Sequence, residues 1–248
     1  MSAKLPRTAM VLAAGRGVRM RPLTLHRPKP LVELAGKALL DHVLDRLADA
    51  GVARAVVNVH YLADQVIAHL APRTRPQIII SDERDMLLDT GGGVVKALTA
   101  LGADAFFHVN SDTVWTEPEQ PALRRLAEAW NDAAMDMLLL LAQPDRSLGY
   151  EGAGDFVLAS DGRLRRRQAA EGPSPVYMGA AILHPRIFGD APAGAFSLNL
   201  LFDRAIAQGR LCALAHDDRR MHVVTPDALR LAEDQPARGA GWAASMRQ

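Results

Sequence analysis

Short apolar runs recur along the first half of the chain. They span Thr8–Ala14, Arg54–Val59, Gln77–Ser81 and Ala105–Asn110, and apolar residues mostly follow one another in them instead of alternating with polar ones. Such runs are typical of strands that are buried on both faces of a parallel sheet. We therefore predict a strand for each of them.

Amphipathic stretches separate these runs. Leu39–Ala50 carries apolar residues at helical spacing and is followed by Gly51, a residue type that commonly ends a helix. Helices are also predicted for Leu62–Leu70 and Gly91–Leu101. The alternation of strand and helix predicts an α/β fold with a parallel, doubly wound sheet and right-handed crossovers.

The second half of the chain is less regular. Strands are predicted for Met135–Ala142 and Tyr177–Leu183, and helices for Leu198–Gln208 and Pro226–Asp234. Residues 236–248 are rich in glycine and alanine and are expected to form a loose tail. Because no repeat and no linker stands out, we expect residues 1–248 to form one domain.

The composition narrows the class of protein. The chain has 248 residues, of which 49% are hydrophobic, enough for a sizeable core. A net charge of +1 with no extended basic block argues against a nucleic-acid binder. Cys212 is the single cysteine, which excludes an intramolecular disulfide and suits a reducing compartment. No segment resembles a signal peptide or reaches membrane-spanning length, so a soluble, cytoplasmic protein without a membrane partner is expected.

One loop stands out for its chemistry. Leu12–Leu31 reads LAAGRGVRMRPLTLHRPKPL, in which glycines follow the first predicted strand and lead into cations and prolines. Backbone N–H groups of such a turn, together with Lys and Arg, suit a phosphate group. The spacing matches neither the P-loop nor the G-x-G-x-x-G dinucleotide pattern. A plain solvated turn would explain the glycines but not the prolines that hold Lys29 in place.

A second glycine cluster, Asp89–Gly93, precedes a predicted helix. Three glycines there are costly in entropy unless something approaches the backbone closely. The alternative is a loose loop in which Asp89 or Thr90 caps the helix. Both interpretations remain open on the residues alone.

An aspartate follows the fourth predicted strand, in Asn110-Ser111-Asp112. Ligands of open α/β sheets bind beyond the carboxyl ends of the strands, where such a carboxylate could hold Mg²⁺. The alternative is an Asx turn, which is a common role for Asn and Asp after a strand.

The first loop resembles a known family. Leu12–Leu31 meets every position of the pattern L-A-A-G-x-G-x-R-M-x-P-L-T followed by P-K-P-L, which is typical of the sugar-1-phosphate nucleotidyltransferases. The similarity extends to about Glu233. Leu88–Gly93 and Val109–Asp112 resemble segments of a uridylyltransferase subfamily. The resemblance implies a Rossmann-like, doubly wound mixed sheet, with nucleotide bound by about residues 1–115 and the sugar phosphate by about residues 116–235.

The resemblance also implies roles for particular residues. Arg19, Lys29 and Asp112 would be catalytic, and Asp112 would hold Mg²⁺. The residues implied to bind nucleotide are Ala14, Gly15, Gly17, Val18, Arg19, Lys29, Gly91 and Gly92. The residues implied to bind the acceptor are Asn110, Asp155, Tyr177 and Gly179.

Two features depart from the family pattern. An E-K-P segment that many members carry before the Tyr177–Leu183 strand is missing. The family's W-x-D-V-G-T segment corresponds to Met221–Pro226, where His222 replaces a metal-binding aspartate and Val224 replaces a glycine. Imidazole is a poorer ligand for Mg²⁺ than carboxylate, so His222 is either a metal ligand or a histidine without metal.

The function implied is transfer of a nucleotidyl group from a nucleoside triphosphate, preferably UTP, to a sugar 1-phosphate, with release of pyrophosphate. N-acetylmuramate or hexosamine 1-phosphate is the expected acceptor, and cell-wall sugar recycling the expected context. The alternatives are a guanylyltransferase for mannose 1-phosphate and a catalytically inactive nucleotide-sensing module, which the changes at His222 and Val224 would favour.

Overall fold

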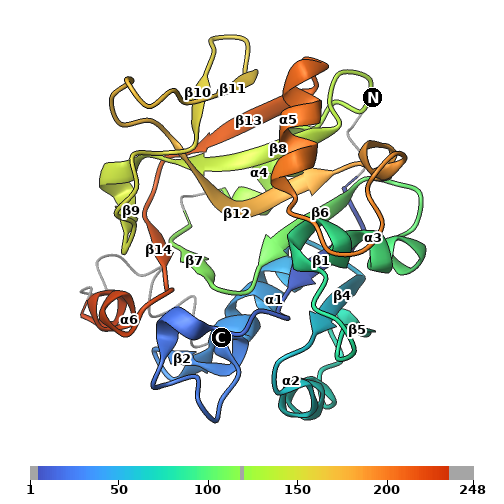
Figure 1. Ribbon diagram of the computed structural model, residues 1–248, viewed down its shortest axis with the longest axis vertical. Coiled ribbons are helices and arrows are strands. Elements are labelled where there is room, and N and C mark those ends of the chain that lie inside the picture. The colour runs from blue at the N-terminus through green and yellow to red at the C-terminus, as the bar shows by residue number, and fades with distance from the viewer. Residues whose placement is uncertain (1–4, 118–119, 235–248) are drawn as a thin grey trace.

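The computed structural model describes residues 5–117 and 120–234 and is organised around one large sheet with helices on both faces (Figure 1). The strand order is β13-β8-β12-β6-β1-β4-β5. The strands are β1 (Thr8–Leu12), β4 (Arg54–Val59), β5 (Gln77–Asp82), β6 (Phe106–Asn110), β8 (Met137–Ala142), β12 (Val176–Leu183) and β13 (Leu211–His216). Only β12 runs against its neighbours β6 and β8, which makes the sheet mixed, as the family resemblance implied.

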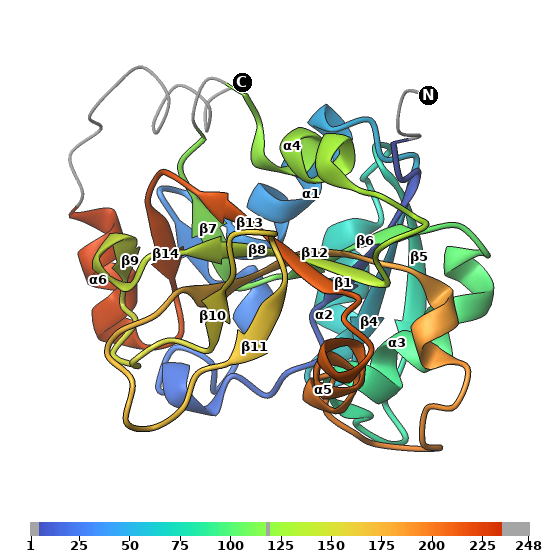
Figure 2. The same cartoon turned by 90° about the horizontal axis from the view of Figure 1, so that it is seen from above.

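Apolar helix faces cover both sides of this sheet. One side carries α1 (Leu39–Asp49), α2 (Ala63–Leu70) and α4 (Ala122–Ala129), and the other carries α3 (Asp89–Leu101) and α5 (Asn199–Ala207). Figure 2 shows α1 and α4 on the side of the sheet away from α3 and α5. Each layer buries its own hydrophobic cluster, and burial of this apolar surface is the main force that holds the layers together.

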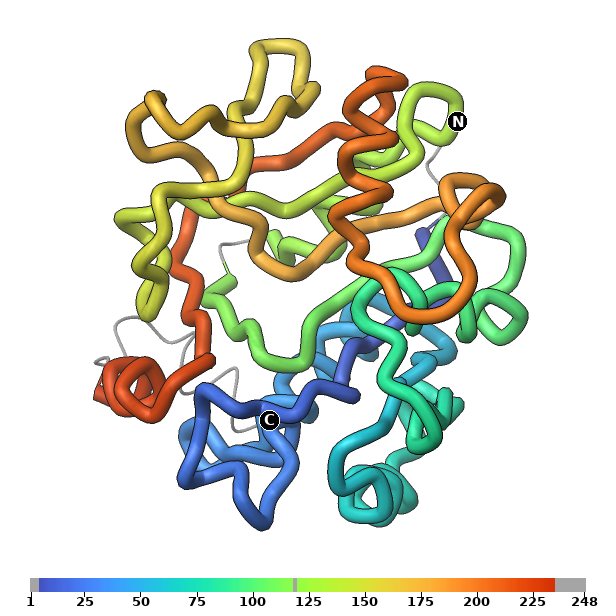
Figure 3. Tube along the Cα trace, viewed as in Figure 1, coloured from blue at the N-terminus to red at the C-terminus, as the bar shows by residue number. Residues whose placement is uncertain are grey.

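A smaller unit stands beside the carboxyl ends of β1 and β6. Its sheet has the order β7-β14-β9, formed by Thr113–Trp115, Arg220–His222 and Ser147–Leu148, and α6 (Pro226–Glu233) packs on it. Met20 and Leu34 share a hydrophobic cluster with residues of this unit. The trace in Figure 3 accordingly brings residues 220–234 near residues 18–39.

The remaining elements are short. They are β2 (Glu33–Leu34), β3 (Lys37–Ala38), β10 (Phe156–Leu158), β11 (Leu164–Arg166) and the 3₁₀ turns η1 (Val18–Met20), η2 (Lys29–Leu31), η3 (Pro144–Arg146) and η4 (Pro185–Phe188). Within residues 5–117 and 120–234, no helix has both the length and the hydropathy that a membrane crossing requires.

Most predicted elements are present, with altered ends. β1 ends at Leu12 rather than at Ala14, because the Ala13 N–H donates to the side chain of Asn58 and not to a neighbouring strand. The strand β13 and the helix α4 were not predicted, since the apolar run at residues 211–214 is too short to separate a strand from general packing. The loose tail expected at residues 236–248 lies outside the described residues.

Candidate active site

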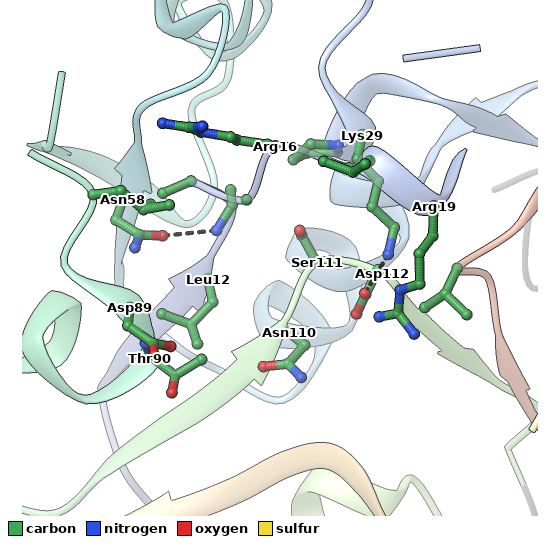
Figure 4. A pocket seen from close by; sticks show the side chains of 18 residues that line it. Leu12, Arg16, Arg19, Lys29, Asn58, Asp89, Thr90, Asn110, Ser111 and Asp112 are labelled. Carbon is green, nitrogen blue, oxygen red and sulfur yellow. Dashed lines mark hydrogen bonds and ion pairs between the residues drawn. The ribbon is translucent and has the colours of Figure 1, made fainter. Parts of the chain in front are cut away.

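A cavity of about 520 Å³ opens at the carboxyl ends of β1, β4 and β6 (Figure 4). It is the edge of the sheet where ligands of open α/β folds bind. Eight residues that the sequence predicted for the site line it, namely Ala14, Gly15, Gly17, Val18, Arg19, Lys29, Asn110 and Asp112. Lining residues that the sequence analysis did not assign to the site are Leu12, Ala13, Arg16, Pro30, Asn58, Leu87, Asp89, Thr90, Ser111 and Val224.

The glycine loop runs directly from β1 into the cavity wall. Gly17 has a φ of 60°, a left-handed conformation that glycine adopts easily, and its carbonyl accepts a hydrogen bond from Thr24 Oγ1 at 2.7 Å. A Cβ atom at Gly17 would lie 2.9 Å from the Cβ of Lys29, whereas one at Gly15 would meet nothing within 4 Å. Gly17 therefore allows the loop to pack against the Lys29 segment, and Gly15 leaves backbone open to the cavity.

Lys29 and Asp112 meet in the cavity although 83 residues separate them. The Lys29 Nζ donates to Asp112 Oδ2 at 2.5 Å, and both side chains are largely buried. Burial by itself would raise the pKa of Asp112, but the charges of Lys29 and, less strongly, of His222 and Arg220 hold it below its usual value. Figure 4 shows the Arg19 side chain directed to the same part of the cavity.

Asp112 is a suitable ligand for a divalent cation. Its Oδ2 accepts from Lys29, while among the described residues Oδ1 makes only a long contact of 3.5 Å with Thr113 Oγ1. The described residues contain no group of three carboxylate, histidine or cysteine side chains placed to hold a metal. Mg²⁺ needs only one or two protein carboxylates when phosphate oxygens and water complete its coordination, so one aspartate facing a phosphate-binding cavity fits the ion.

A buried polar network supports the start of the loop. Asn58 Oδ1 accepts from the Ala13 N–H at 2.7 Å, and Asn58 Nδ2 donates to Glu83 Oε1 at 2.8 Å. Glu83 is 1% exposed, and its other oxygen accepts from the Leu88 N–H at 3.1 Å. The network joins the end of β1 to the start of α3. The only sequence signal for it was a polar residue inside the apolar run Arg54–Val59.

The second glycine cluster has a packing role. A Cβ atom at Gly91 would lie 2.3 Å from the ring of Phe196, and one at Gly92 would lie 2.2 Å from the carbonyl oxygen of Gly194. Gly91 and Gly92 are not among the lining residues, so their contact with nucleotide remains a prediction. Asp89 and Thr90, immediately before them, do face the cavity (Figure 4).

On the acceptor side, Gly179 lies directly against Asn110. Gly179 has a φ of 77°, and a Cβ atom there would be 2.8 Å from Asn110 Nδ2. The pairing of β12 with β8 also shifts register between Tyr177 and Ala181. The glycine thus allows both the irregular pairing of β12 and the close approach of Asn110.

Asp155 and Tyr177 are joined but do not line the cavity. Asp155 Oδ2 accepts from the Tyr177 N–H at 2.9 Å, and the Tyr177 hydroxyl lies 3.2 Å from His108 Nδ1. Burial raises the pKa of Tyr177 and lowers that of His108 to about 4. Their role in binding the acceptor remains a prediction.

His222 stands opposite Thr113 across the β14–β7 pair, next to the Asp112 position. Its ring centroid is 6.4 Å from that of Tyr150. Burial above all, and then the charge of Arg220, lower the pKa of His222 to about 4, while Asp112 opposes the shift. The imidazole is therefore neutral near pH 7, the form that a metal ligand requires.

The fold and the site together define a nucleotide-binding α/β protein of the transferase type. A glycine loop, the cations Arg16, Arg19 and Lys29, and the carboxylate of Asp112 converge at the carboxyl ends of parallel strands, which suits transfer between phosphate groups.

Comparisons with known proteins agree with this class. The family model described as "MobA-like NTP transferase domain" matches residues 9–240. The N-acetylmuramate alpha-1-phosphate uridylyltransferase of Caulobacter vibrioides is 50% identical over 232 residues, which cover 92% of this chain and 96% of that protein. The mannose-1-phosphate guanylyltransferase catalytic subunit beta of Drosophila melanogaster is 39% identical over 114 residues, but the match covers only 44% of this chain and 31% of that protein.

The fold also matches a solved structure. The inositol-1-phosphate CTP transferase of T. maritima superposes with a TM-score of 0.76 at 17% identity, over 93% of this chain and 95% of that chain. The chain belongs to the family of MobA-like NTP transferase domains. It is a nucleotidyltransferase of the sugar-1-phosphate class.

Proposed function

We propose that the protein transfers the uridylyl group of UTP to N-acetylmuramate 1-phosphate and releases pyrophosphate. The observation that carries the proposal is the cavity in which the glycine loop, Lys29 and Asp112 meet. The uridylyltransferase of Caulobacter vibrioides, similar over nearly its whole length, supports the choice of base and acceptor.

The nucleotide occupies the part of the cavity bounded by β1 and α3. Open backbone at Gly15 and the following residues receives the β- and γ-phosphates, with Arg16 and Arg19 supplying charge. The ribose and base extend toward Asp89 and Thr90, which line the other end of the cavity.

The acceptor phosphate enters between Lys29 and Asn110. One of its oxygens attacks the α-phosphorus in line, forming the new P–O bond while the bond to the bridging oxygen breaks and pyrophosphate leaves with the electron pair. Lys29 neutralises charge between the two phosphates, and most of the rate gain comes from positioning and charge stabilisation. When bound at Asp112, Mg²⁺ would add positive charge beside the α-phosphate and the leaving pyrophosphate.

The proposed context is the cytoplasmic recycling of cell-wall sugars. Cys212 is a free, buried thiol, which is consistent with a reducing compartment. We propose residues 1–115 as the nucleotide-binding part of one domain and residues 116–235 as its sugar-phosphate part.

A substrate matrix tests the proposal. Purified protein is given UTP or GTP together with the 1-phosphate of N-acetylmuramate, N-acetylglucosamine or mannose, and pyrophosphate is measured with and without Mg²⁺. UTP with N-acetylmuramate 1-phosphate is expected to give the highest kcat/KM. A preference for GTP and mannose 1-phosphate would identify a guanylyltransferase instead. No pyrophosphate from any pair would favour a nucleotide-sensing module.

A further inference from the structure

Arg220 is a buried cation without a hydrogen-bond or ion-pair partner among the described residues. It lies in β14 and is 3% exposed, yet its guanidinium makes no hydrogen bond or ion pair with any residue in the described part of the chain. Its Nε and Nη1 atoms are also closed to solvent. Burying an ionised group costs several kcal/mol unless it is paired, so Arg220 calls for an explanation.

The neighbouring acidic side chains do not satisfy it. Asp112 and Asp155 are the carboxylates whose charges act most strongly on Arg220, but Asp112 is paired with Lys29 and Asp155 accepts from the Tyr177 N–H. The ring of Tyr150 covers the guanidinium, with its centroid 5.7 Å from the Arg220 Cζ. A cation–π contact of this length does not replace the missing hydrogen bonds.

The position of Arg220 points to the acceptor. It stands two residues before His222 on the strand that pairs with β7, directly after the Asp112 turn. The charged groups that act on it include Asp112, which lines the cavity, and Asp155, which contacts Tyr177. The planar guanidinium fork matches a carboxylate or a phosphate in two parallel hydrogen bonds.

We propose that Arg220 binds an oxyanion group of the acceptor, which reaches the guanidinium by displacing the Tyr150 ring. The proposal rests on the proposed function and deepens it. N-acetylmuramate 1-phosphate carries two such groups, the lactyl carboxylate and the 1-phosphate. N-acetylglucosamine 1-phosphate has the same phosphate but a hydroxyl in place of the lactyl ether. Comparing the two acceptors therefore shows whether Arg220 binds the carboxylate or the phosphate.

The test compares Arg220→Met and Arg220→Lys with wild type, and Arg230→Met is the control because its side chain is 72% exposed on α6. The KM of each acceptor is measured at saturating UTP, and the KM of UTP at saturating acceptor. We expect Arg220→Met to raise an acceptor KM by roughly 10- to 100-fold, the effect of losing a charged hydrogen-bond pair, while the KM of UTP changes by less than about twofold. Arg220→Lys keeps the charge but loses the two parallel donors of the guanidinium, so its acceptor KM should rise less. It replaces Arg220→Met in the test if the methionine variant does not fold.

The outcomes separate cleanly. A rise confined to the muramate acceptor assigns the carboxylate to Arg220, and an equal rise for both acceptors assigns the phosphate. Unchanged acceptor KM values in a folded variant, or equal losses for UTP and acceptor, would overturn the proposal and leave Arg220 a structural charge. If wild type turns over no acceptor, the proposed function is wrong. That result comes from wild type alone and is therefore distinct from a failure of the Arg220 proposal.

Discussion

The polar network beneath the glycine loop is expected to contribute heavily to stability. Asn58→Ala removes the acceptor for the Ala13 N–H and the donor to Glu83, and both groups are then left buried. Leaving a buried donor unsatisfied costs about 1–3 kcal/mol, and losing a hydrogen bond to a carboxyl group costs about 1.5–3 kcal/mol. The expected loss is therefore about 2.5–6 kcal/mol, a large part of the roughly 5–15 kcal/mol typical of a whole domain.

Urea unfolding followed by circular dichroism measures this loss. Asn199→Ala is the matched control, because Asn199 is exposed and its side chain makes hydrogen bonds at the surface, accepting from Arg166 and donating to Ser197 Oγ. The control is expected to stay within about 0.5 kcal/mol of wild type. Asn58→Asp keeps the acceptor for Ala13 but sets a second buried carboxyl group against Glu83 in place of the donor, so it should also destabilise the protein. If Asn58→Ala lost no more than the control, the network would not hold the loop.

Four further predictions concern the cavity and its surroundings. Asp112→Asn should lower kcat by roughly 10²–10⁴-fold with folding intact, and a variant within a few-fold of wild type would leave Asp112 a turn residue. Lys29→Ala should weaken acceptor use and turnover, and Lys29→Arg should not restore them fully because a guanidinium is not a compact charge; full activity in either would contradict the role. Gly92→Ala should cost about 1–3 kcal/mol in urea unfolding because its Cβ meets the Gly194 carbonyl, whereas Gly172→Ala, with open space, should be near neutral. Since the pKa of His222 falls from 6.5 to about 4 on folding, wild type should lose stability as the pH drops from about 6.5 to 4, and His222→Gln should remove part of that loss; identical pH dependence in urea would show that the shift is absent.

Local patterns predicted the framework of the fold. The apolar run Arg54–Val59 forms a strand with those bounds, and the periodic stretch from Leu39 forms a helix that ends one residue earlier than predicted. Such elements can be read from consecutive residues, because hydrophobic periodicity and turn chemistry are local properties. The mixed order of the sheet came from the family resemblance, since no local pattern sets the direction of β12.

The sequence by itself determined that a loop rich in glycine and cationic residues follows the first strand and that Asp112 follows the fourth predicted strand. It could not determine what these residues meet. The contact between Lys29 and Asp112 and the burial of Arg220 join segments far apart in the chain. Only the packing of non-adjacent strands and helices decides such contacts, because burial and hydrogen-bond satisfaction depend on every element that surrounds a residue. For the same reason, the residues next to Gly91 and Gly92 in the sequence do not predict that these glycines pack against Phe196 and Gly194.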